Sequence, residues 1–310
     1  MRVYKHFNSK GRAVLFNGDC QQLLKELPEE SVDLVVTSPP YCMGKAYEDP
    51  HDDIETFKDQ HIKIFHNLYR SVKVGGSICW QVGYHVSNRC VVPLDYVIYD
   101  LFISLSAKLD NPLELRNRII WTFGHGLNST KRFSGRHETI LWFTKGPQKV
   151  FNLDDVRIPQ KYPGKKYYRG AHKGEFSGNP LGKNPSDVWD IPNVKANHVE
   201  KTIHPCQFPT SIPQRLIKAL SPMNGVVLDP FCGVGTTGVA SILENRKFIG
   251  AETQKEYYGV AMERILAAAK GNIKVREDKP VMKPNRKDSV ARLPEEFRKL
   301  RNKERKNVGK

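Results

Sequence analysis

The chain has 310 residues, 39% of them hydrophobic, which is enough for one large folded domain or two small ones. Its 49 Lys and Arg residues outnumber the 33 Asp and Glu residues, and the net charge of +16 suits a polyanionic partner. No stretch reaches the roughly 18 apolar residues of a membrane span, so we expect a cytoplasmic protein with no membrane partner. The six cysteines lack paired or zinc-ligand spacing, which predicts reduced thiols and no metal site.

Short apolar runs predict seven strands, and helical patterns lie between most of them. The expected strands are 13–16, 34–37, 77–82, 118–123, 139–143, 226–228 and 248–251. The expected helices are 21–27, 54–72, 94–105, 212–220, 237–244 and 256–268. Strands that alternate with helices are typical of a doubly wound, mostly parallel α/β sheet. Because no helix separates strands 118–123 and 139–143, these two favour an antiparallel hairpin at the edge of the sheet.

The domain organisation follows from two changes in composition. In residues 151–200, glycines interrupt a stretch rich in aromatic and basic residues, and no periodicity survives, which indicates a functional insertion or disorder. Residues 1–150 and 201–269 are therefore expected to be two halves of one domain. Residues 270–310 form a tail with 15 Lys and Arg against 6 Asp and Glu, which either holds a polyanion through its phosphates or only aids solubility.

A glycine-rich loop between the strand at 226–228 and the next helix predicts a nucleotide site. Gly233 and Gly235 open a G-x-G-x-x-G pattern, and Glu252 follows at the end of the next strand, where an acid binds a ribose hydroxyl. Asp229 would repel the pyrophosphate of NAD but would accept hydrogen bonds from the ammonium group of S-adenosylmethionine. The loop therefore favours S-adenosylmethionine, and an NAD-dependent oxidoreductase is the alternative.

The sequence Ser-Pro-Pro-Tyr follows directly after the strand at 34–37. The Ser38 hydroxyl and the Pro39 carbonyl are suited to accept the two hydrogens of a nucleobase amine and so aim its lone pair at a methyl donor. Tyr41 offers a ring on which an extruded base can stack. A proline-rich strand terminator with a buried tyrosine is the alternative explanation, which the nearby cofactor loop weakens.

Both segments resemble motifs of one enzyme family. Thr37-Ser38-Pro39-Pro40-Tyr41 resembles the catalytic (D/N/S)PPY motif of amino-directed DNA methyltransferases, and the segment from Asp229 to Gly235 resembles their cofactor motif. The catalytic motif comes first, as in the β-class of the family, a circular permutation of the common order. The resemblance covers residues 13–265. It implies a seven-stranded, Rossmann-like methyltransferase sheet, S-adenosylmethionine as cofactor, and methylation of a flipped base in double-stranded DNA.

The resemblance also implies roles for segments and residues. It makes 1–150 the catalytic half, 151–200 the target-recognition insertion and 201–269 the cofactor-binding half. The implied catalytic residues are Ser38, Pro39, Pro40 and Tyr41. The implied cofactor-binding residues are Asp19, Asp229, Phe231, Cys232, Gly233, Gly235, Thr236 and Glu252. The candidate DNA contacts are Lys131, Arg132, Arg136, Lys165 and Lys166.

Four shorter matches have competing explanations. Asp19 resembles an acidic contact to the adenosyl group, but it would equally cap the helix after it. His137 lies in a segment like the strand that lines the family's base pocket, and His204 opens an H-P-x-x-x-P segment. Either histidine could be an ordinary hydrogen-bonded one. Pro205-Cys206 resembles the nucleophile of cytosine-C5 methyltransferases, but it lies upstream of the cofactor loop, and a C5 enzyme would not need Ser-Pro-Pro-Tyr.

The target amine and the partners are implied less directly. Within the family, Ser before Pro-Pro is associated with N4 of cytosine and Asp or Asn with N6 of adenine, so Ser38 favours N4 and N6 is the alternative. A non-catalytic nucleic-acid-binding protein and an RNA methyltransferase are further alternatives, and the intact Ser38, Tyr41, Asp229 and Glu252 argue against the first. A cognate restriction endonuclease would be a functional partner, and the enzyme is expected to be a monomer or a homodimer.

Overall fold

The computed structural model describes residues 1–41, 53–87, 90–124, 126, 128–159, 162 and 164–277. Most of the basic tail, residues 278–310, lies outside the described residues, so its contacts with DNA stay a prediction. No helix in the described part of the chain is long and apolar enough to cross a membrane.

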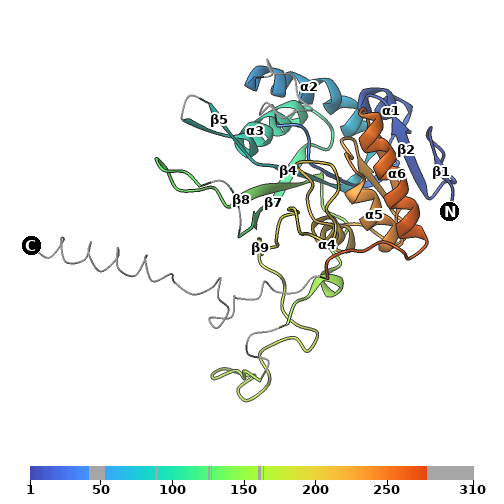
Figure 1. Ribbon diagram of the computed structural model, residues 1–310. Coiled ribbons are helices and arrows are strands. Elements are labelled where there is room, and N and C mark those ends of the chain that lie inside the picture. Colours follow the sequence, from blue (N-terminus) through green and yellow to red (C-terminus); the bar gives the residue numbers. More distant parts are fainter. Residues whose placement is uncertain are drawn as a thin grey trace, which may run out of the picture. The chain divides into compact units, whose positions relative to one another are not determined.

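The described residues form one nine-stranded sheet in the order β1-β2-β11-β10-β3-β4-β8-β7-β9 (Figure 1). The strands are β1 (Val3–Tyr4), β2 (Ala13–Asn17), β3 (Val32–Thr37), β4 (Val72–Val82), β7 (Leu113–Thr122), β8 (His137–Lys145), β9 (Val188–Asp190), β10 (Val226–Asp229) and β11 (Lys247–Glu252). Neighbouring strands are parallel except where β8 pairs with β4 and β7. All seven predicted strands are present, but the predicted total is too low because β1 and β9 are too short to show a period.

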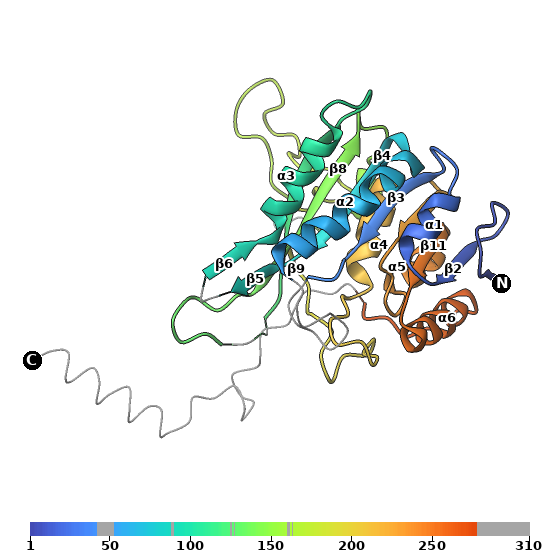
Figure 2. The same ribbon diagram turned by 90° about the horizontal axis from the view of Figure 1, so that it is seen from above.

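Six helices in the described part of the chain cover the two faces of this sheet (Figure 2). The helices α1 (Cys20–Glu26), α2 (Ile54–Ser71) and α3 (Leu94–Ser106) share one buried cluster with the sheet. The helices α4 (Ser211–Leu220), α5 (Thr236–Leu243) and α6 (Lys255–Ala269) pack on the opposite face. Each predicted helix is present, with ends within one residue of those expected. A small antiparallel pair, β5 (Tyr84–Ser87) and β6 (Cys90–Pro93), lies outside the main sheet and was not predicted.

Helix α2 shows why the helix predictions succeed. Phe57, Ile64, Phe65 and Leu68 recur at helical spacing, and all four side chains are buried against the sheet. The Asp53 side chain caps the first turn by accepting a hydrogen bond of 2.9 Å from the Thr56 backbone N–H. A capped apolar stripe of this length is the clearest helix signal that a sequence carries.

The strand order places a topological switch point between β3 and β10. Strand β10 continues through α5 to β11 on one side, whereas β3 continues through α2 to β4 on the other. Leu228 lies opposite Val35 in the parallel β3–β10 ladder, which confirms that the two motif-bearing strands are neighbours. The loops that follow them therefore open side by side at the carboxyl edge, where α/β sheets bind ligands.

The insertion at 151–200 is anchored to the sheet. Strand β9 pairs in parallel with β7, and an antiparallel bridge joins Ile158 to Lys183. Regular structure is therefore present in this segment, at β9 and in a short 3₁₀ helix at Leu153–Val156, although the sequence shows no periodicity there. Trp189 and Ile191 are buried, whereas Val188 and Asp190 are exposed, but three residues are too few for this alternation to be read from the sequence. Because β9 covers the outer side of β7, the β7–β8 hairpin is not at the very edge of the sheet.

Candidate active site

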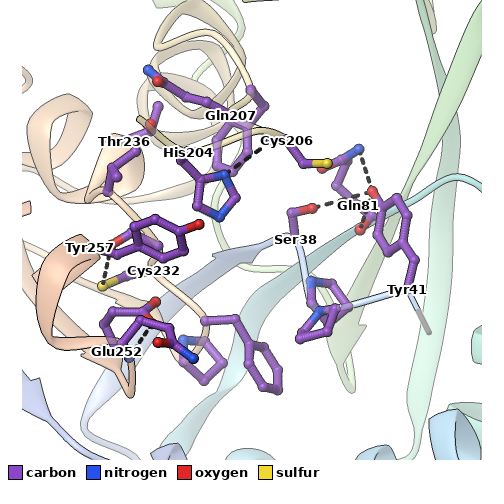
Figure 3. Close-up of a pocket in the computed structure, with 18 of the residues that line it drawn as sticks. Ser38, Tyr41, Gln81, His204, Cys206, Gln207, Cys232, Thr236, Glu252 and Tyr257 are labelled. Carbon is purple, nitrogen blue, oxygen red and sulfur yellow. Dashed lines mark hydrogen bonds between the residues drawn. The ribbon is translucent and has the colours of Figure 1, made fainter. Parts of the chain in front are cut away.

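A cavity of about 590 Å³ opens at the switch point (Figure 3). Its lining comes from the end of β11 and from the segments that follow β2, β3, β10 and β11. Side chains of α2, β4, β7 and β8 and residues of the segment 193–208 complete it. Ten of the predicted site residues line it: Asp19, Ser38, Pro39, Pro40, Tyr41, Phe231, Cys232, Gly233, Thr236 and Glu252. The fold thus brings into one cavity two motifs that lie about 190 residues apart in the sequence, as the hydrogen bond between Thr37 and Asp229 spans 192 residues.

One wall of the cavity is a chain of hydrogen bonds. The Ser38 Oγ lies 3.2 Å from the Tyr41 hydroxyl, which accepts a hydrogen bond of 2.8 Å from the Gln81 side-chain amide. The same amide donates to the Glu138 carboxylate. Gln81 comes from β4 and was not predicted, whereas Glu138 comes from β8, in the segment Arg136-His137-Glu138 that resembles the strand lining the family's base pocket. These contacts fix the orientation of Tyr41 relative to Ser38 (Figure 3).

The opposite wall carries the acid and the glycine. Glu252 ends β11, and its Oε1 accepts a hydrogen bond of 2.8 Å from the Gln254 backbone N–H. Burial raises the pKa of the Glu252 carboxyl above its usual value. Gly233 has a φ of +51°, and a side chain there would project to within 3.4 Å of the His204 imidazole. The Tyr257 ring, which sequence reasoning did not find, packs edge-on against His204 at 4.7 Å between centroids.

Asp229 lies behind the cavity rather than in its lining. Its buried Oδ1 accepts hydrogen bonds of 2.6 Å from the Thr37 hydroxyl and 3.2 Å from the Phe231 backbone N–H. Burial raises the pKa of the Asp229 carboxyl to about 6, although its hydrogen bonds favour the charged form and lower the pKa. The Oδ1 therefore ties the end of β3 to the cofactor loop, whereas the buried Oδ2 has no hydrogen-bond partner among the described residues. Its contact with the ammonium group stays a prediction.

Gly235 is not among the described residues that line the cavity, and its contact with the cofactor stays a prediction. It has a φ of +75° at the N-terminus of α5, and an added Cβ would lie 2.9 Å from the Cβ of Ala261 in α6. The position requires glycine for a left-handed backbone and for close packing of two helices. Close approach to a ligand is not needed to explain it.

The variant Gly235→Ala should lower the free energy of unfolding by about 1–3 kcal/mol, since the left-handed conformation alone costs about 1–2 kcal/mol. Chemical denaturation measures the change. Gly259→Ala is the matched control, because Gly259 lies within α6 and no heavy atom lies within 4 Å of an added Cβ there. This control variant should be neutral or stabilising. Equal losses in both variants would contradict the packing role of Gly235.

The shorter matches have mixed outcomes. Asp19 does cap α1, through a hydrogen bond of 2.7 Å from the Gln21 backbone N–H to its Oδ1, and it also lines the cavity. His204 lines the cavity, and burial, with the nearby Lys201, lowers the pKa of its imidazole to about 4. His137 is not among the described lining residues, whereas Glu138 is, because successive residues of β8 face opposite sides.

The predicted DNA contacts lie outside the described lining of the cavity. Lys131 and Arg132 are exposed in the segment that joins β7 to β8. Lys165 and Lys166 are exposed in the insertion, where the Lys166 ammonium lies 5.2 Å from the centre of the Phe176 ring. Their contact with DNA stays a prediction. No group of three or more His, Cys, Asp or Glu side chains in the described part of the chain is placed to hold a metal ion.

Comparison with known proteins identifies the class of enzyme. The family model for N6/N4 methyltransferases, described as DNA methylase, matches residues 32–263. The type II methyltransferase M.BglII of Bacillus subtilis is 46% identical over 250 residues, which are 80% of this chain and 68% of that enzyme. The type II methyltransferase M.ScaI of Streptomyces caespitosus is 38% identical over 273 residues, covering 86% of this chain and 85% of that one.

A solved structure agrees with this class. The Thermus thermophilus protein TTHA0409 in complex with S-adenosyl-L-methionine is 28% identical, with a TM-score of 0.59 over 83% of this chain and 94% of that one. The chain belongs to the N6/N4 family of DNA methylases. It is a DNA methyltransferase, and S-adenosylmethionine is its methyl donor.

The residues present fit this cofactor. A volume of about 590 Å³ lies within the usual range of small-molecule sites, about 300–1,000 Å³. Glu252 presents a carboxylate to the cavity, and a carboxylate can accept hydrogen bonds from the two hydroxyl groups of a ribose. Gly233 leaves open the space between the loop and His204 that any side chain would fill. The cavity therefore has room and polar groups on the cofactor side, and a separate polar wall around Ser38.

Proposed function

We propose that the protein is a type II methyltransferase that methylates N4 of cytosine in double-stranded DNA. The relatives M.BglII and M.ScaI, both named type II methyltransferases, support the type II assignment. The observation that carries the choice of amine is the hydroxyl of Ser38, placed before Pro39-Pro40 at the mouth of the cavity. N6 of adenine is the second candidate, because Asn or Asp oxygens serve the same acceptor role in the family.

In this proposal the cavity wall around Ser38 holds the target amine. The Ser38 hydroxyl and the Pro39 carbonyl accept its two hydrogens, which draws the nitrogen toward tetrahedral geometry and exposes its lone pair. The Tyr41 ring stacks on the flipped base, and Gln81 and Glu138 hold that ring in place through the Tyr41 hydroxyl. Bound S-adenosylmethionine supplies the electrophilic methyl group.

The opposite wall binds the cofactor in this proposal. Glu252 accepts hydrogen bonds from the ribose, Gly233 allows close backbone approach, and Asp19 contacts the adenosyl side. Phe231, Cys232 and Thr236 line the same wall and contribute contacts. Thr37 holds only the Oδ1 of Asp229, and the buried Oδ2 has no hydrogen-bond partner among the described residues. In this proposal Oδ2 accepts a hydrogen bond from the ammonium group of the cofactor, while Oδ1 positions the loop.

The biological role follows the type II assignment. We infer that methylation protects DNA from a cognate restriction endonuclease that reads the same site, so that the partnership is functional and needs no physical complex. Lys131, Arg132, Arg136, Lys165 and Lys166 supply phosphate contacts that position the duplex without reading its sequence.

Nucleoside analysis tests the proposed target. Purified enzyme and tritiated S-adenosylmethionine are incubated with a duplex DNA library, and the digested product is separated by chromatography. Tritium should appear in N4-methylcytosine. Label in N6-methyladenine would establish the second candidate, and label only when RNA replaces DNA would overturn the DNA substrate.

A further inference from the structure

The segment that joins β7 to β8 presents a large apolar side chain to solvent. Phe133 is 100% exposed, the largest exposed fraction among the apolar side chains that the structure describes. Burying an aromatic ring removes about 150–250 Å² of surface from water, so Phe133 offers a large apolar contact to any partner that covers it. Figures 1 and 2 show the segment, in green, projecting away from the sheet on the side of β5 and β6.

The segment around Phe133 is held in place by contacts at its base. The Ser129 backbone N–H donates a hydrogen bond of 3.0 Å to the Ser134 hydroxyl, and the Arg136 guanidinium donates one of 2.7 Å to Asn128. The Arg132 guanidinium lies 5.7 Å from the centre of the Tyr84 ring in β5. The neighbours of Phe133 are therefore braced, while its own ring packs on nothing in the described part of the chain.

Both ends of this segment lie at the cavity. Phe123, directly after β7, and Glu138, in β8, are lining residues. Glu138 lies five positions after Phe133, so the two Cα atoms are at most roughly 18 Å apart in an extended chain. That reach is of the order of the major-groove width, about 12 Å. A duplex whose target base enters the cavity thus brings its neighbouring base pairs within reach of Phe133.

The charges beside the ring match that partner. Lys131 and Arg132 are exposed and precede Phe133 directly, so the ring lies next to two cations suited to phosphates. An apolar side chain among basic residues is the composition that architectural DNA-binding proteins use to open a base step.

We propose that Phe133 is a wedge that enters the base stack of the bound duplex beside the target nucleotide and stabilises its extruded state. The ring fills the space that the flipped base leaves, while the base itself reaches the wall around Ser38. Phe133 touches neither the reacting amine nor the cofactor, and it acts by positioning the target. The inference rests on the proposed methylation of a flipped base in duplex DNA.

The test compares Phe133→Ala with wild type on two duplexes that contain the site identified by sequencing the methylated library. One duplex is fully paired, and the other has an abasic site opposite the target base, which lowers the cost of extrusion. The methylation rate of the variant on the paired duplex should be about 10- to 100-fold lower, because alanine no longer offsets the free-energy cost of unstacking the target base. On the abasic duplex it should methylate within about threefold of wild type.

Two further measurements separate a wedge from a merely structural residue. Fluorescence of 2-aminopurine next to the target base, recorded without methyl transfer, should rise on binding to wild type and to Phe133→Leu but not to Phe133→Ala. Tyr96→Ala, which removes another exposed ring from α3 at 64% exposure, is the matched control and should behave as wild type.

An equal rate loss on both duplexes, or no loss on the paired one, would overturn the wedge. Failure of the wild type on both duplexes would instead count against the proposed function, so the two failures are distinguishable.

Discussion

Replacement of Ser38 by alanine should lower the turnover number by about 10²–10³-fold, the usual effect of losing one hydrogen bond that strengthens in the transition state. The Pro39-Pro40 backbone is unchanged, so the variant loses one acceptor for the target amine and keeps the shape of the wall. Steady-state kinetics with saturating S-adenosylmethionine measure the effect. Duplex binding should survive, because phosphate contacts dominate affinity and are proposed for residues outside this wall.

Two variants control for indirect effects at this wall. Tyr41→Phe removes the hydroxyl that lies 3.2 Å from Ser38 but keeps the ring, so its turnover should fall less than tenfold, as expected for a neutral hydrogen bond. Ser38→Asn restores an acceptor oxygen and should recover part of the lost rate. A Ser38→Ala enzyme with wild-type turnover would show that Ser-Pro-Pro-Tyr is not the catalytic site.

Replacement of Glu252 by alanine should weaken S-adenosylmethionine binding by about 1.5–3 kcal/mol, the size of a hydrogen bond to a charged group. In terms of the dissociation constant this is an increase of roughly 10- to 150-fold, which isothermal titration calorimetry on the DNA-free enzyme measures directly. Glu256→Ala is the matched control, since it removes an exposed acid four residues away that is not among the described lining residues. Equal affinity in Glu252→Ala and wild type would refute the ribose assignment.

The raised pKa of Glu252 adds a pH dependence to this prediction. Burial favours the neutral carboxyl, so protonation begins at a higher pH than in an exposed glutamate. The wild-type affinity for S-adenosylmethionine should therefore fall as the pH falls through that raised pKa. Glu252→Gln cannot titrate and should bind more weakly but with a flatter pH profile. A flat profile for the wild type would contradict a charged acceptor.

Local signals in the sequence predicted most of this fold. A capped apolar stripe such as that of α2, and a run of buried β-branched residues such as that of β3, each fix an element without reference to the rest of the chain. The G-x-G pattern and Ser-Pro-Pro-Tyr placed Gly233 and Ser38 at the carboxyl ends of two strands. Parallel strands that end in ligand motifs meet at one edge, so the cavity itself was predictable.

The contacts made across the sheet were not predictable in the same way. Gln81 and Glu138 meet only because β8 pairs antiparallel to β4 in a particular register, and no local pattern records that register. The burial of Asp229 behind the cavity depends on Thr37, 192 residues away. Gly235 fits a ligand motif in sequence, yet the partner that requires glycine there is Ala261 of another helix.

The bridge between Ile158 and Lys183 has an evolutionary consequence. The Ile158–Lys183 bridge holds together the two ends of the chain that runs between these residues. After this loop, β9 pairs with β7, and the chain then returns to the cavity, where Asn193 and Lys195 are lining residues. Loop closure costs only about 0.6 kcal/mol more for each doubling of length. The family resemblance implies that the insertion recognises the target sequence, and on that basis we expect that a lineage can lengthen or exchange residues 159–182 while β9 stays in register. New DNA specificities can then be acquired by replacing one contiguous cassette, with the methyl-transfer chemistry inherited intact.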